Sequence, residues 1–516
     1  MRFSKRTTIG ILLLALTLLP AQTLSQTLSR RGWAGTGLTV APWWQSAILY
    51  QIDPVSFQDS KGDGFGDLRG ILTRLDYLQA LGVDALLLAP LQPGPAAAPA
   101  NAGQPFDTAY GTPEDLDQLI GDAGRHRIRI LADLPLSGAR TTQETVSVAR
   151  FWLSRGVAGL RLTLDAADPL TAAQLADRVR ELKRLSATYA GDRVLFWDVS
   201  PPPPNPDKPI APPHRSYASS HPQAPANSAP DAAQMTLNPA LETIPRLDAA
   251  ALRHALASLP PLRPGHTFVL ATDGSDHPRS LDRYGSGSDE IELAKALATA
   301  LLASPGAPLL YFGQEIGMAT TPAPAADRSG PGAPTPMQWG DAKGFSSGDP
   351  WIDMGRNALT ANVAVEDADR YSLLNWYRRL TALRHAKAVL REGSVDVLQL
   401  SNPSLVAWVR RTRTADAPVV VICNLSAFPA SLSIASELHR LRIPAGTGVM
   451  HTLAASNTPV AATNAERPDP GLDAPVSISA IALPAYGVYL GELRGQAGLE
   501  TMPSPVRSRN PSKTGK

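Results

Sequence analysis

Between residues 41 and 390, short apolar runs of strand length alternate with segments of helical periodicity. Strands separated by crossover helices pair in parallel, so this alternation predicts a parallel sheet built from βαβ units. Eight such runs predict a closed (β/α)8 barrel, which is an α/β fold. The eight predicted strands cover residues 47–52, 84–90, 128–134, 158–164, 193–199, 233–237, 267–273 and 307–313.

The pattern changes after residue 392, where strand-like segments such as SLVAWVRRT and PVVVICNL follow one another and the helices stop. This change predicts a C-terminal β-sandwich over residues 393–495, after a barrel over residues 41–392. The single cysteine, Cys423, excludes an intramolecular disulfide and is expected to be a buried thiol on a strand. The formal net charge of +2 gives no reason to expect a nucleic-acid partner.

Three segments fall outside both predicted domains. Residues 1–26 have a basic start and a short apolar run, which is typical of an export signal. We therefore expect an exported protein, periplasmic or extracellular, with an uncleaved membrane anchor as the alternative. The proline-rich insert at residues 200–232 and the basic tail at residues 496–516 have few apolar residues to bury, so both are expected to be disordered.

Four long stretches of the sequence carry a family resemblance. They are WWQSAILYQIDPVSFQDSKGDGFGDLRGI (43–71), GVDALLLAP (82–90), GAPLLYFGQEIGM (306–318) and PTPMQWGDAKGFSSGDPW (334–351). In this order they resemble the α-amylase superfamily (glycoside hydrolase family 13), in particular its oligo-1,6-glucosidase and trehalose-synthase branch, and the resemblance spans roughly residues 42–495. It implies an α/β barrel followed by a β-sandwich, with an α-linked oligosaccharide or glucan as the ligand.

The same resemblance shows departures at the positions that carry the family's chemistry. Strand four should present an arginine and, two residues later, the nucleophilic aspartate, but Arg161 is followed by Thr163. Ser137-Gly138 replace the family's Asn-His after strand three, and strand five offers Asp198 in place of the acid glutamate. The candidate catalytic residues are therefore Asp276, Asp198 and Asp165, and the candidate substrate-binding residues are Asp133, Arg161 and Asp107.

The chemistry available to these residues is limited. A retaining glycosidase needs two carboxyls about 5–5.5 Å apart, and a neutral hydroxyl such as that of Thr163 attacks only with an adjacent base. Asp165 shares a strand face with Thr163 but lies about 6.6 Å further along the strand. We expect a catalytically impaired pseudoenzyme that binds glycan or acts as a protein partner, with Arg161 in a salt bridge to a neighbouring acid. The alternative is an active retaining α-glucosidase, α-glucan hydrolase or transglycosylase with displaced carboxylates.

Two further features follow from the resemblance. Only one helix fits between Asp133 and Arg161, so the family's subdomain between strands three and four (subdomain B) is expected to be absent. The loop DSKGDGFGDLRG corresponds to a calcium-binding loop, in which oxygens of four residues would be ligands. Lys61 stands at a ligand position, so its ammonium is the alternative to Ca²⁺, and Gly70 at the twelfth position excludes an EF-hand. The four candidate metal ligands are Asp59, Asp63, Phe65 and Asp67.

Overall fold

The computed structural model of the protein describes most of the chain from residue 41 onward. The expected export signal, the tail at 496–516 and nearly all of the proline-rich insert lie outside the described residues. Among the residues that are described, no helix is long and apolar enough to cross a membrane. The described residues are 41–91, 106–136, 140–165, 170–200, 232–275, 277–285, 290–321, 334–340, 344–413, 416–444, 446, 448–456 and 473–494.

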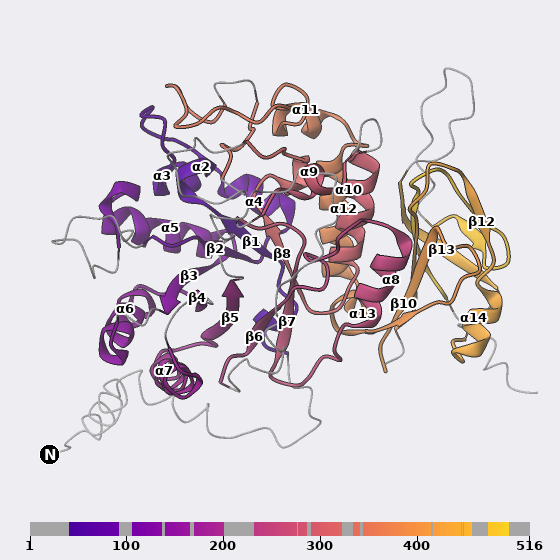
Figure 1. Cartoon of the computed structure of the whole chain (residues 1–516), viewed down its shortest axis with the longest axis horizontal. Helices are drawn as coiled ribbons and strands as arrows, with labels where there is room; N and C mark the ends of the chain where they lie inside the picture. Colours follow the sequence, from indigo (N-terminus) through magenta and orange to yellow (C-terminus); the bar gives the residue numbers. More distant parts are fainter. Residues whose placement is uncertain are drawn as a thin grey trace, which may run out of the picture. The chain divides into compact units, whose positions relative to one another are not determined.

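Eight parallel strands close into a barrel in sequence order, β1 to β8 (Figure 1). Closure is completed where β1 pairs with β8, with Leu49 aligned to Leu309. The predicted (β/α)8 fold is therefore confirmed, including the weak sixth strand. The strands are β1 (Leu49–Ile52), β2 (Ala85–Leu88), β3 (Arg129–Leu136), β4 (Gly159–Asp165), β5 (Val194–Ser200), β6 (Met235–Asn238), β7 (Thr267–Ala271) and β8 (Ala307–Tyr311).

Most of the barrel helices begin at a residue whose side chain caps the free amides. Thr112, Thr141 and Thr171 each form a capping box with the residue three positions later. Between β3 and β4, the described residues contain α6 as their one helix. The helices of this part are η1 (Trp43–Gln45), α2 (Pro54–Phe57), α3 (Leu68–Leu72), α4 (Leu75–Leu81), η2 (Thr108–Tyr110), α5 (Pro113–Arg125), α6 (Thr142–Ser154), α7 (Ala172–Ser186), α8 (Ala249–Ala257), α9 (Ser280–Tyr284), α10 (Glu290–Leu302), η4 (Gln314–Ile316), α11 (Val363–Ala368), α12 (Leu373–Ala386) and α13 (Ala388–Glu392).

The barrel interior changes from apolar to polar toward the carboxyl ends of the strands. Alternate strands of such a barrel contribute side chains to one layer, and every second residue of a strand points inward. One buried apolar layer consists of Leu49, Leu131, Phe196 and Val269. Two residues further along the same four strands are Gln51, Asp133, Asp198 and Ala271, all of them buried. This second layer places two carboxylates directly above the apolar layer, at the mouth of the barrel.

The C-terminal part contains a six-stranded antiparallel sheet in the order β14-β13-β16-β11-β10-β9, and the pair β12-β15. The expectation that helices stop at residue 392 was wrong, because α14 (Ala435–Arg440) forms shortly after β12. Ile434 and Leu438 are four residues apart, so one face of the helix carries both into the apolar core of this part. Cys423 is buried as predicted. The strands are β9 (Ser394–Val397), β10 (Leu405–Arg411), β11 (Val419–Asn424), β12 (Ala430–Leu432), β13 (Val449–Ala455), β14 (Pro475–Ser477), β15 (Ile481–Leu483) and β16 (Val488–Glu492).

A buried arginine joins the C-terminal sheet to the barrel. Arg410 of β10 donates hydrogen bonds to the carbonyl oxygens of Ala303 at 2.6 Å, Gly393 at 2.7 Å and Ser394 at 3.1 Å. Burial, followed by the nearby charge of Arg384, lowers the pKa of Arg410 well below its usual value. The guanidinium therefore satisfies carbonyl groups that water cannot reach.

We expect Arg410→Met to lower the free energy of unfolding by about 3 kcal/mol, because the buried carbonyl oxygens of Ala303 and Gly393 lose their donors. The matched control is Arg411→Met, which removes a surface pair with Asp396 and should cost no more than about 1 kcal/mol. Urea unfolding followed by circular dichroism measures both. Equal losses in the two variants would contradict this role of Arg410.

Candidate functional site

Three neighbouring strands bring together an arginine and two aspartates at the barrel mouth. Asp133 of β3 aligns with Arg161 of β4, and Thr163 aligns with Asp198 of β5. The Arg161 guanidinium lies 2.5 Å (Nη2) and 2.7 Å (Nε) from Asp198 Oδ2, and Nη1 lies 3.4 Å from Asp133 Oδ2. Both aspartates are only 3 % exposed. The ion pair expected between Arg161 and a neighbouring acid is thus present, and a single guanidinium serves two carboxylates.

The hydroxyl of Thr163 is also engaged in this cluster. Thr163 Oγ1 donates a hydrogen bond to Asp133 Oδ1 at 3.0 Å. Burial raises the pKa of Asp133 to about 6 against the opposing effects of Arg161 and of the Thr163 hydrogen bond, and the charge of Asp198 adds to the rise. Asp133 is therefore mainly ionised at pH 7 and becomes protonated in mildly acidic solution. We call Asp133, Arg161, Thr163 and Asp198 the mouth cluster.

The remaining candidate residues lie in different settings. Asp165 is the last residue of β4, in register with Ser200, and its side chain is outside the described part of the structure, as is all of Asp276. Asp107 caps η2, where its Oδ1 accepts a hydrogen bond from the Ala109 amide at 3.0 Å.

Two acids at the mouth were not predicted from the sequence. Asp53 and Asp273 stand two residues beyond Gln51 and Ala271, so alternation turns both toward the interior. Burial raises the pKa of Asp53 to about 6 although its carboxylate accepts a hydrogen bond from the Val55 amide. Counting every second residue past the ends of the predicted strands could have found both acids.

The two new acids differ in their partners. Asp273 Oδ1 accepts hydrogen bonds from the amide and the hydroxyl of Ser280, both at 2.5 Å, and lies 3.5 Å from Arg283 Nη2. Asp53 contributes with Asp107 to a pKa of about 12 for Tyr110, after the larger effect of burial.

The loop after α2 contains the candidate calcium ligands. Asp59 Oδ1 accepts hydrogen bonds from the amides of Lys61 and Gly62, and Oδ2 accepts from the Gly64 amide and the Ser346 hydroxyl, all between 2.6 and 2.8 Å. A carboxylate has about four lone-pair sites, so these donors saturate Asp59. In the part of the chain that the structure describes, no three His, Cys, Asp or Glu residues are grouped so as to hold a metal ion. The donor set does not fit Ca²⁺.

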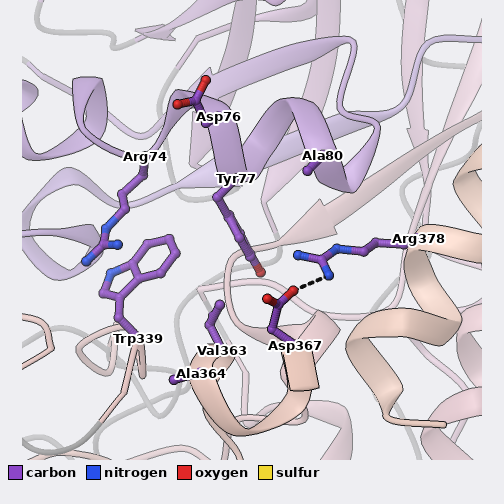
Figure 2. Close-up of a pocket in the computed structure, with 9 residues that line it drawn as sticks. All are labelled: Arg74, Asp76, Tyr77, Ala80, Trp339, Val363, Ala364, Asp367 and Arg378. Carbon is purple, nitrogen blue, oxygen red and sulfur yellow. Dashed lines mark hydrogen bonds and ion pairs between the residues drawn. The ribbon is translucent and has the colours of Figure 1, made fainter. Parts of the chain in front are cut away.

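A cavity of about 670 Å³ lies apart from the mouth cluster, between α4, α11 and α12 (Figure 2). The Arg74 guanidinium lies over the Trp339 ring, 4.1 Å from its centroid, and Tyr77 packs edge-on against the same ring. The Tyr77 hydroxyl donates to the buried carboxylate of Glu315. These contacts already occupy the ring, so the cavity gives no support for sugar stacking. Its lining residues are Arg74, Asp76, Tyr77, Ala80, Trp339, Val363, Ala364, Asp367 and Arg378.

Comparison with known protein families connects this geometry to carbohydrate-active proteins. The family "Alpha amylase, catalytic domain" matches residues 51–137 and 242–393, which include β1 to β3 and β7 to β8. The chain is a relative of the α-amylase family. The barrel with a following antiparallel sheet and the recognised family agree with the resemblance in the sequence.

Individual α-amylase relatives align with most of the chain. Trehalose-6-phosphate hydrolase of Escherichia coli K12 is 27 % identical over 74 % of this chain and 91 % of its own length. Oligo-1,6-glucosidase of Bacillus cereus is 23 % identical over 75 % of this chain and 91 % of its own. The trehalulose synthase MutB of Pseudomonas mesoacidophila MX-45 superposes with a TM-score of 0.65, 20 % identity and coverage of 88 % and 100 %. That structural likeness shows a shared fold.

The titration of Asp133 predicts a dependence of stability on pH. Its folded pKa of about 6 lies above the ordinary value of 3.8, so between these values the folded state holds an extra proton. Its contribution to stability therefore falls as the pH rises from about 4 to 6, by up to about 3 kcal/mol. Asp133→Asn should remove this component, so the advantage of the unmodified protein over the variant should be larger at pH 4 than at pH 7.

Urea unfolding at both pH values measures this difference. The exposed Asp117, which pairs with Arg155 at the surface, provides the control variant Asp117→Asn. An equal effect of Asp133→Asn at pH 4 and pH 7 would show that Asp133 titrates normally in the folded protein.

Removing the shared cation should destabilise the barrel. Arg161→Met leaves Asp133 and Asp198 buried without their guanidinium, and breaking a buried pair in this way typically costs about 3–5 kcal/mol. The triple variant Arg161→Met, Asp133→Asn, Asp198→Asn should recover much of that loss, because no uncompensated charge remains. Thermal unfolding of both proteins checks this, and a triple variant as unstable as the single variant would contradict it.

Proposed function

We propose that this chain is an α-amylase-family protein that binds α-linked oligosaccharides or glucan at the barrel mouth and has little or no hydrolytic activity. The observation that carries the proposal is the state of the mouth cluster. Thr163, with a neutral hydroxyl, stands at the position where the resemblance implies the attacking carboxylate. Its hydroxyl donates a hydrogen bond to Asp133. Asp198, the candidate proton donor, is bound to Arg161.

Glycoside hydrolysis requires one carboxyl that is protonated and a second that is ionised. Arg161 lies 2.5 Å from Asp198, so this carboxylate is already engaged in an ion pair within the protein. Thr163 in the attacking role would form an ordinary glycoside rather than an acyl-linked intermediate, and an ordinary glycoside is no easier to hydrolyse than the substrate. Both arguments favour binding over turnover.

The nature of the ligand is inferred from the relatives and from the free acids at the mouth. Solved structures of MutB contain isomaltulose or its substrate sucrose, both small carbohydrates. Asp53 is half-buried, and no ion pair to it is found within the described residues, so its carboxylate is able to accept hydrogen bonds from sugar hydroxyls. We therefore propose that the Asp53 carboxylate accepts hydrogen bonds from the bound sugar.

The competing function is an active α-glucosidase, α-glucan hydrolase or transglycosylase that uses displaced carboxylates. Asp165 is the last residue of β4, and Asp276 follows β7 in the sequence. This alternative requires that one of them act together with Asp198. A role as the partner of another protein is a further outcome, in which no sugar binds.

We expect saturable binding of α-linked disaccharides and glucose release no faster than in Asp198→Asn. Isothermal titration with isomaltose, trehalose and sucrose measures binding, and glucose release from the same sugars and from an aryl α-glucoside measures turnover. Asp53→Asn keeps the helix cap but should weaken binding about tenfold, because a hydrogen bond to a charged acceptor becomes neutral. The surface variant Asp117→Asn should bind normally.

Glucose release that disappears in Asp198→Asn, and also in Asp165→Asn or Asp276→Asn, would establish the competing function. Blank titrations with all the sugars, together with reproducible capture of one partner protein, would favour the protein-partner role.

Export is part of the same proposal. The basic residues Arg2, Lys5 and Arg6 before the apolar run support it. Mass determination of the N-terminus of the protein recovered from its native cells would distinguish a cleaved signal from an anchor.

A further inference from the structure

Hydrogen bonds join the loop between α2 and α3, which follows the first barrel strand, to segment 344–351, which is distant in the sequence. The Asp59 amide donates to the carbonyl of Phe345 at 3.0 Å, and the Ser346 hydroxyl donates to Asp59 Oδ2 at 2.6 Å. The Trp351 amide donates to the carbonyl of Gly64 at 3.1 Å. Loop 59–67 and segment 344–351 thus form one hydrogen-bonded unit, which we call the clasp.

The packing of the clasp is too close to permit larger residues at its turns. Gly64 has a φ of 88°, and a Cβ at this residue would lie 2.2 Å from the carbonyl oxygen of Asp349. Only glycine accepts this conformation and this approach without strain. The loop is therefore held in one shape by its own backbone and by segment 344–351.

The carboxylates of the clasp are satisfied from within the protein. The Asp59 carboxylate accepts four hydrogen bonds, from the Ser346 hydroxyl and from the amides of Lys61, Gly62 and Gly64. Asp67 Oδ1 accepts hydrogen bonds from the Gly70 amide and the Ser60 hydroxyl, both at 2.8 Å. Lys61 supplies the positive charge, with Nζ 3.9 Å from Asp67 Oδ2.

We propose that the clasp is metal-independent, and that the Lys61 ammonium holds the place that a divalent cation takes in loops of this spacing. In such loops the first, third, fifth and ninth positions supply oxygen ligands, and here they are Asp59, Lys61, Asp63 and Asp67. The third position thus carries a cation rather than a ligand. The positive charge of the Lys61 side chain therefore stabilises the clasp without a metal ion. This inference does not depend on the proposed function.

The test uses the full-length protein and measures thermal unfolding in EDTA and in CaCl2, together with isothermal titration with CaCl2. The unmodified protein should have the same midpoint in both solutions and give no saturable heat. Lys61→Met removes the charge and should lower the midpoint by about 2 °C, with no recovery in CaCl2. Lys61→Asn supplies an amide oxygen at the third position and should bind one equivalent of Ca²⁺ and gain a calcium-dependent rise in midpoint.

A lower midpoint of the unmodified protein in EDTA, or saturable Ca²⁺ binding to it, would overturn the proposal. So would a Lys61→Asn protein that folds but does not respond to Ca²⁺, because the ammonium would then not be what takes the cation's place. If Lys61→Asn does not fold, Ser346→Ala provides a second test. It removes one donor from Asp59, and a Ca²⁺ response in that variant alone would support the view that internal donors exclude the metal.

Discussion

Closure of the eight strands is the constraint on which the rest of the structure depends. A closed parallel barrel turns every second residue of each strand inward and gathers the residues of alternate strands into layers. Leu49, Leu131, Phe196 and Val269 fill one layer, and the next layer toward the mouth carries Asp133 and Asp198. The polar site is therefore set by the same geometry that fills the core, and no loop is needed to position it.

One close approach makes this arrangement possible. Gly159 begins β4, and a Cβ at this residue would lie 2.5 Å from the carbonyl oxygen of Val194 on β5. The absence of a side chain lets β4 lie near β5, and two residues later Arg161 reaches Asp198. Burying charged groups costs free energy unless they are paired, so the pairing of Arg161 with Asp133 and Asp198 offsets the cost of burying all three. The mouth cluster is therefore stable without any ligand.

The mouth cluster and the clasp have a common feature. The resemblance implies a sugar ligand at the position of Thr163 and a cation at the position of Lys61. In both places, groups of the protein itself make the contacts instead. The Thr163 hydroxyl donates to Asp133, and Ser346 donates to Asp59. On the proposed function, the fold has been kept while the groups that would exchange with solvent or substrate have become hydrogen-bonded within the protein.

The sequence by itself determined the barrel, the later antiparallel strands and the pairing of Arg161 with an acid, because strand and helix periods are local properties of the chain. It also identified Lys61 and Thr163 as departures at their positions. Only the tertiary structure decided that α14 forms at Ala435–Arg440 and that Ser346 completes the shell of Asp59. These outcomes depend on contacts between residues far apart in the sequence, and periodicity carries no information about which distant donor a buried carboxylate will meet.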